Sequence, residues 1–138
     1  LPLTSMSCIL QPTWTSGYRI RHGGVGSSYL GQNNLTPQIS TFNATWGAAN
    51  SELTVGSFGV VTERYGTSGT SGAGITVNNG SETTHTGTYA AHTTLSMSDG
   101  AAFGDIDYAA VFVINRALTP TETANMRTWL GTRGGLTL

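Results

Sequence analysis

The spacing of short β-type runs constrains this chain more than any other feature. Runs rich in aromatic and β-branched residues recur roughly every ten residues, and clusters of Gly, Ser and Asn separate them. Strands of this length at this spacing are typical of an all-β sandwich or barrel. The strands that this pattern predicts are 18–22, 27–30, 38–42, 58–65, 75–77, 83–89, 93–97 and 108–114.

Two of these segments carry more detailed expectations. Tyr108–Ile114 is apolar on both sides of the pleat, which is typical of a strand covered on both faces. The Asn79-Gly80 pair after the 75–77 run favours the positive φ angles of a type I′ hairpin turn. We therefore expect a well-covered strand near the C-terminus and a tight hairpin in mid-chain.

One helix is predicted, at the C-terminal end of the chain. Thr119-Pro120-Thr121-Glu122 has the form of a capping box with Pro at the first helical position. Met126, Trp129 and Leu130 follow at helical spacing and form one apolar stripe. We expect a helix over 120–131 that ends at Gly131 or Gly134 and packs this stripe, Trp129 included, into the core.

Charged residues make up 9% of the 138 residues, against about 25% in typical globular proteins. Lysine is absent, and the net charge is −1. This balance excludes the basic surface that nucleic acids require, and no apolar run approaches the roughly 20 residues of a membrane helix. We expect a single domain over 1–138 that neither binds nucleic acid nor inserts into membranes. Its Thr-, Ser-, Asn- and Gly-rich surface suggests an extracellular or virion-surface location.

The single cysteine, Cys8, excludes an intrachain disulfide. In an extended strand Met6, Cys8 and Leu10 share one face, so we expect Cys8 to be a small buried apolar side chain. A catalytic thiol would need a neighbouring His or Arg and partial exposure, and no motif indicates either.

The C-terminal third carries the most specific motif. A Gly- and Asp-rich segment from Gly104 precedes an apolar strand, and Asn115-Arg116-Ala117-Leu118-Thr119-Pro120 follows it. This order resembles the last strand and helix start of concanavalin A-like, laminin-G-like jelly-roll domains, of the kind found in phage tail fibres and secreted bacterial proteins. Residues 55–62, 75–80 and 95–100 also resemble strands and turns of that superfamily, so the resemblance covers about 55–131.

The resemblance implies an all-β fold, a two-sheet antiparallel jelly-roll sandwich with one short C-terminal helix. It also implies that Arg116 lies at a strand end and bonds backbone carbonyls or a carboxylate. Ala110 stands where many relatives have Glu, so any role of that carboxylate is absent. Complete domains of this type have more N-terminal sequence, so we expect a trimmed variant or a fragment whose missing edge strands come from another chain.

The acidic residues do not match a polysaccharide-degrading enzyme of this fold, which needs two carboxylates flanking the bond. The pattern Glu-x-Asp-x-x-Glu is missing, and Asp105 and Asp107 are expected to bond backbone amides; a metal contact or catalysis is the alternative. The loop around Asp99 holds one carboxylate, whereas calcium needs 6–8 oxygen ligands. We expect no catalytic residue, no metal site and no cofactor, calcium included. The carboxylates are Glu52, Glu63, Glu82, Asp99, Asp105, Asp107 and Glu122.

The histidines give no sign of a metal or catalytic site. His22, His85 and His92 have neither a Cys nor a His at zinc-ligand spacing. His85 is conceivable as a general base, but a surface or strand histidine without chemistry is the simpler interpretation.

Sugar binding through aromatic and amide side chains is the remaining chemistry. Trp14 and Trp46 lie outside the apolar runs among polar neighbours, as loop tryptophans do, and Asn43 and Asn79 lie near turns. A sugar would stack on a tryptophan and be oriented by an amide; the alternative is that both rings only cover the edge of the core.

Two classes of function follow from these observations. The first is a non-catalytic module that binds a carbohydrate or cell-surface receptor, in a phage tail fibre, spike or secreted adhesin. The second is a structural module of a virion or surface assembly, and a polysaccharide-degrading enzyme is a third alternative. In either of the first two classes we expect a homo-oligomer, which would be a trimer in a phage fibre.

Overall fold

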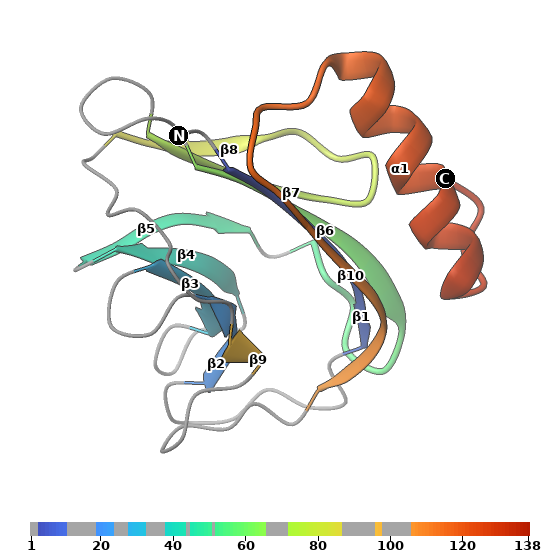
Figure 1. Ribbon diagram of the computed structural model, residues 1–138. Helices are drawn as coiled ribbons and strands as arrows, with labels where there is room; N and C mark the ends of the chain where they lie inside the picture. The colour runs from blue at the N-terminus through green and yellow to red at the C-terminus, as the bar shows by residue number, and fades with distance from the viewer. Residues whose placement is uncertain are drawn as a thin grey trace.

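The computed structural model shows two antiparallel sheets and one C-terminal helix (Figure 1). It describes residues 3–10, 19–23, 28–32, 38–43, 45–50, 52–65, 72–86, 96–97 and 106–138. The first five-stranded sheet has the order β10 (Asp107–Ile114), β1 (Leu3–Leu10), β6 (Phe58–Tyr65), β7 (Ala73–Val77) and β8 (Thr83–His85). The second five-stranded sheet has the order β5 (Thr45–Asn50), β4 (Ile39–Asn43), β3 (Ser28–Gln32), β2 (Arg19–Gly23) and β9 (Ser96–Met97). The helix is α1 (Pro120–Arg133).

The first sheet joins the two ends of the chain. β1 pairs on one side with β10, from Thr4 opposite Ile114, and on the other side with β6 along its whole length. A register shift between Cys8 and Ile9 on the β10 side lets the strand follow the curvature of the sheet. The N-terminal strand is therefore held by pairings distant in sequence.

An apolar core lies between the two sheets. From the first sheet it takes Ile9, Val61, Ile75 and Val77, from the second Leu30 and Ile39, and Leu53 from the connection to β6. Every one of these side chains is buried, so the inner faces of the sheets pack directly on each other.

A second core lies on the outer face of the first sheet, which α1 covers (Figure 1). Met6, Cys8, Val60 and Leu130 are its buried members, and Phe112 and Met126 pack against it. Side chains alternate across each strand, so one strand serves both cores, as Val60 and Val61 do in β6. Cys8 is free and buried, as expected, and burial raises the pKa of its thiol.

The structure confirms most of the predicted elements. β6 has the predicted bounds, and the helix begins as predicted, with the full Thr119–Glu122 capping box, but extends to Arg133 with Gly134 as its C-cap. β8 is shorter than expected, with three residues, and the rest of the predicted 83–89 strand beyond Thr86 lies outside the described residues.

Two local predictions are wrong. The two faces of β10 are only partly covered, since its residues are exposed or half-buried and Val113 is 40% exposed. Within the described part of the chain β10 pairs with β1 alone. The turn after β7 is not type I′, because Asn78 has a positive φ of 52° whereas Asn79 and Gly80 do not. Asn78 instead extends the β6–β7 pairing, since its backbone N–H donates to Val60 O and its Oδ1 accepts from Val60 N–H.

Trp129 is also not a core residue. Its side chain is 46% exposed, while its neighbour Leu130 is fully buried. The Trp129 ring meets Phe112 edge-on, with centroids 5.3 Å apart, and the Arg133 guanidinium lies over the Trp129 ring, 4.5 Å from its centroid. The helix turns Leu130 toward the sheet, and this orientation leaves Trp129 at the border of the contact.

Candidate functional site

The structure places two of the four candidate sugar-binding residues in one hairpin. Asn43 ends β4 and Trp46 lies in β5, and the pairing of Asn43 with Thr45 and of Phe42 with Trp46 closes a tight hairpin. Trp46 is therefore a strand residue, not the loop residue predicted from its polar neighbours. Trp14 lies outside the described residues. We call Asn43, Thr45 and Trp46 the β4–β5 hairpin tip.

Asn79 lies at the opposite end of the molecule from this tip. Gly47, which follows the tip, lies beside His85, and His85 pairs with Ala73 at the start of β7. Asn79 follows Val77 at the far end of the same strand, in an exposed turn. In Figure 1 the hairpin lies at the left and the turn between β7 and β8 at the right, near α1. A small ligand that contacts the hairpin tip therefore does not reach Asn79.

The backbone just after the hairpin tip runs closely against the first sheet. A Cβ at Gly47 would lie 3.0 Å from Thr41 Oγ1 and 3.2 Å from His85 Nδ1, which is tighter than ordinary contact. Glycine at this position therefore allows β5 to approach β7 and β8. The approach sets the Thr41 hydroxyl and the His85 imidazole next to each other between the sheets.

A buried carboxylate lies in the same part of the inter-sheet space. Glu63 is only 1% exposed, and Tyr65 Oη donates to its Oε1 at 3.3 Å. Tyr65 pairs with Ala73, which pairs in turn with His85, so these side chains belong to one face of the first sheet. We call Thr41, Glu63, Tyr65 and His85 the inter-sheet polar cluster. His85 is its half-buried member, and the other three are buried.

The buried position of Glu63 was not among the predictions from the sequence. The signal was present in the alternation of β6, where Glu63 falls between Val61 and Tyr65 on the face that turns inward. A lone carboxylate within a β-branched run looks like a solvent-facing residue unless that alternation is followed. Its burial requires hydrogen-bond partners, and Tyr65 is one of them.

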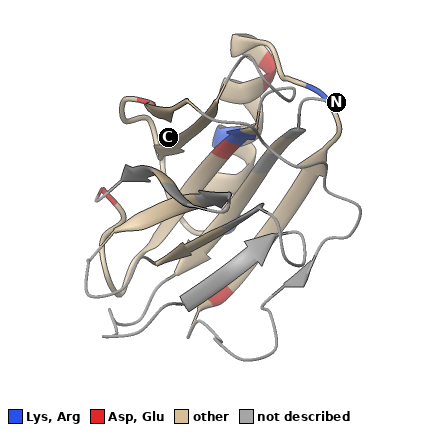
Figure 2. Ribbon diagram, turned by 90° about the vertical axis from the view of Figure 1, so that its left-hand side faces the viewer, with Lys and Arg blue, Asp and Glu red and all other residues tan. Residues whose placement is uncertain are grey.

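The other described carboxylates are Glu52, Glu82, Asp107 and Glu122. Glu82 forms an ion pair with Arg64, Glu122 forms one with Arg116, and Asp107 is exposed at the start of β10. Acidic and basic positions are few and scattered over the described ribbon (Figure 2). Within that part of the chain, no group of three His, Cys, Asp or Glu side chains could hold a metal ion. Asp99 and Asp105, weighed for calcium and for catalysis, lie outside the described residues.

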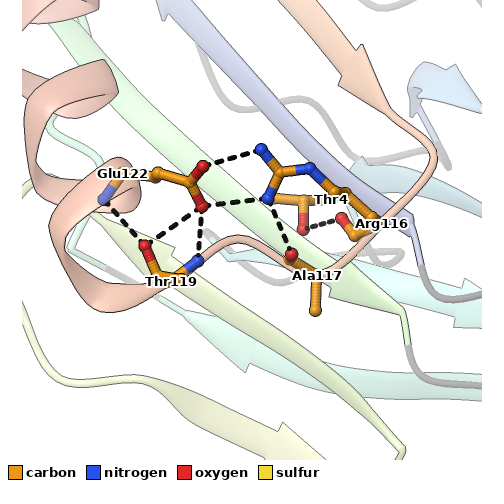
Figure 3. Close-up of polar contacts among 5 residues, drawn as sticks. All are labelled: Thr4, Arg116, Ala117, Thr119 and Glu122. Carbon is orange, nitrogen blue, oxygen red and sulfur yellow. Dashed lines mark hydrogen bonds and ion pairs between the residues drawn. The ribbon is translucent and has the colours of Figure 1, made fainter.

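The C-terminal motif that carried the family resemblance, Asn115–Pro120, connects β10 to β1 and to the start of α1 through hydrogen bonds (Figure 3). We call this segment the latch. Arg116 donates from both terminal nitrogens to the Glu122 carboxylate, at 2.7 and 2.9 Å, and to Ala117 O at 3.2 Å. This confirms the expectation for Arg116. Thr4 Oγ1 donates to Arg116 O at 3.0 Å, which ties the latch to β1.

Glu122 links this latch to the helix start. The side-chain bond from Arg116 and the bonds from the Thr119 backbone N–H and hydroxyl lower the pKa of Glu122 to about 2. The same carboxylate lies in the first turn of α1, where the helix dipole favours negative charge. The motif therefore fixes the path of the chain from β10 into α1. The side chains of Arg116, Thr119 and Glu122 are engaged in these structural hydrogen bonds.

Comparisons of the chain with protein-family models, with curated proteins and with solved structures find no match. No helix in the described part of the chain is long and apolar enough to cross a membrane.

Proposed function

We propose that this chain is a non-catalytic recognition module that binds a carbohydrate or a cell-surface receptor, built on a concanavalin A-like jelly-roll sandwich. The two antiparallel sheets packed through a shared core, and the adjacent N- and C-terminal strands, support this architecture. The Asn115–Pro120 latch that leads into a C-terminal helix supports it as well. The module would act at an extracellular or virion surface, without a metal or cofactor.

The β4–β5 hairpin tip is the proposed contact surface. The observation that carries this proposal is that Asn43 and Trp46, an amide and an aromatic residue, share one tight hairpin. An aromatic ring can stack on the apolar face of a sugar, and a carboxamide can both donate to and accept from its hydroxyls. Asn79, at the opposite end, is not included in this site.

A structural role in a surface assembly is the second candidate, and β10 favours it. Within the described part of the chain β10 pairs only with β1, and its eight residues contain one charge, at Asp107, and no proline. Natural edge strands are usually protected by charges, prolines or bulges. β10 has one charge, at its start, and one register shift, opposite Cys8 and Ile9, so the rest of its edge can accept another strand. This supports a homo-oligomer, and in a phage fibre the oligomer would be a trimer.

A glycan array tests the binding proposal. Wild-type protein, Trp46→Ala and Asn43→Ala would be compared with Trp129→Ala, which removes an exposed tryptophan far from the hairpin tip. We expect binding to at least one glycan that resists EDTA, falls at least tenfold in both hairpin variants and stays unchanged in Trp129→Ala. Binding abolished by EDTA, or lost equally in Trp129→Ala, contradicts the proposed site. Absence of binding by the assembled oligomer favours the structural role.

A further inference from the structure

The outer face of the first sheet carries a group of charged side chains beside α1, remote from the hairpin tip. Arg127 extends from the helix to β6, where its Nε donates to Thr62 Oγ1 at 3.1 Å. Within the described part of the chain this is the one hydrogen bond that Arg127 makes. The bond fixes one edge of the guanidinium and leaves the edge formed by Nη1 and Nη2 available.

A second arginine lies across the same face. Arg64 donates to both carboxylate oxygens of Glu82, from Nε at 3.0 Å and from Nη2 at 3.1 Å. Gly74 lies in β7, between β6 and the segment that leads into β8, directly beneath this ion pair. Any larger residue at this position would collide with the Glu82 carboxylate. Because position 74 has no side chain, Arg64 and Glu82 can lie close to the surface of the sheet.

Within the described part of the chain, no carboxylate is hydrogen-bonded to Arg127. Glu82, which attracts Arg127 electrostatically, has both of its carboxylate oxygens bonded to Arg64. Burial lowers the pKa of Arg127, with nearby Glu82 acting in the opposite direction. A half-buried guanidinium has lost part of its hydration, and a bound anion would compensate for that loss.

We propose that Arg127 forms a binding site for an oxyanion, a carboxylate or sulfate group. The free edge of a guanidinium matches such a group with two parallel hydrogen bonds. The group could belong to an acidic glycan or be a free inorganic anion, and both sources share this chemistry. The site is separate from the hairpin tip, so it stands or falls independently of the proposed function.

Sulfate titration of the full chain tests the site. The melting temperature and isothermal calorimetry would be measured with sodium sulfate and with sodium chloride at matched ionic strength. We expect sulfate to stabilise the wild type more than chloride, since a ligand that binds only the folded state raises its stability. Arg127→Gln should weaken sulfate binding at least tenfold, and Arg127→Lys should restore it in part.

Two further variants separate this site from general charge effects. Arg133→Gln makes the same change in net charge on the same helix, where Arg133 stacks on Trp129, and should leave sulfate binding unchanged. Glu82→Gln removes the competing carboxylate and should tighten sulfate binding several-fold, whereas a purely structural Arg127–Glu82 attraction predicts only loss of stability. Equal effects of sulfate and chloride, or undiminished binding in folded Arg127→Gln, would overturn the proposal. Tighter binding of a glucuronate oligosaccharide than of sulfate identifies an acidic glycan as the ligand; equal binding identifies the inorganic oxyanion.

Discussion

Two neighbouring residues of α1 provide a sharp test of how the helix docks. Leu130 is fully buried against Met6, Cys8 and Val60, while Trp129 is about half exposed. Sequence periodicity alone places both side chains in the core. The structure instead predicts that Leu130→Ala costs much more stability than Trp129→Ala, although the tryptophan is the larger side chain.

The magnitudes follow from the contacts. Leu130→Ala leaves a cavity in a buried cluster and should cost about 3 kcal/mol, within the range of buried Leu→Ala changes. Trp129→Ala loses an edge-on contact with Phe112, worth about 0.5–1.5 kcal/mol, and a stacked Arg133, worth about 0.5–1 kcal/mol. Alanine recovers roughly 0.5 kcal/mol of helix propensity, so the net cost is about 1 kcal/mol.

Urea denaturation followed by circular dichroism measures this difference. With an m-value of about 2 kcal/mol/M, Leu130→Ala should lower the midpoint by about 1.5 M and Trp129→Ala by about 0.5 M. Unchanged m-values would show that both variants unfold from the same native state. Equal midpoint losses, or a larger loss for Trp129→Ala, would refute the docking geometry.

Three further changes have defined outcomes. Ser7→Ala should be neutral or stabilising by up to about 1 kcal/mol in urea denaturation, because Ser7 Oγ is buried and has no hydrogen-bond partner in the described part of the chain. A loss of stability above about 1 kcal/mol would contradict this and reveal a partner of Ser7. Gly134→Ala should cost about 1–3 kcal/mol by overpacking, since the added Cβ would lie 2.5 Å from Cys8 Sγ, and an unchanged melting temperature would contradict this packing. The folded-state pKa of Glu122, about 2, lies below its usual value of 4.5, so its contribution to stability is complete above about pH 4.5 and disappears as the pH falls through about 2. The melting-temperature gap between wild type and Glu122→Gln should close over that interval, and a gap independent of pH would exclude the ion pair as its cause.

The sequence predicted the features that depend on local signals. The capping box at Thr119 and Glu122 is a short-range pattern with its own hydrogen bonds, and the helix starts there as expected. The run at Phe58–Tyr65 contains the β-branched residues of a buried strand, and β6 has those bounds. Both features owe little to distant parts of the chain.

The wrong predictions concern positions within the assembled fold. An apolar run such as Tyr108–Ile114 fits a strand that is covered on both faces or only in part. How far each face of β10 is covered depends on the packing of the assembled fold. Trp129 fits the apolar stripe of the helix, but the rotation of α1 depends on how Leu130 enters the second core. Trp46 is followed by a glycine because β5 approaches β7 and β8 closely at position 47, and in the described sheet β5 pairs with β4 alone.

The candidate site was predicted only in part for the same reason. Residue types identified Asn43, Trp46 and Asn79 as binding candidates, but not which of them lie together. The pairing of β4 with β5 joins the first two, and the length of β7 separates Asn79 from them. Glu63 was missed because its burial depends on the second sheet covering β6.

The most direct test of the proposed recognition site uses the indole N–H signals of the three tryptophans. Each signal would be assigned by substitution in a ¹H–¹⁵N spectrum, and the protein would then be titrated with the glycan bound most tightly on the array. The account predicts that the Trp46 indole signal shifts in a saturable manner with the same affinity as binding, while the Trp129 signal stays in place. A shift confined to Trp129, or saturation of binding without any change at Trp46, would contradict a site at the β4–β5 hairpin tip.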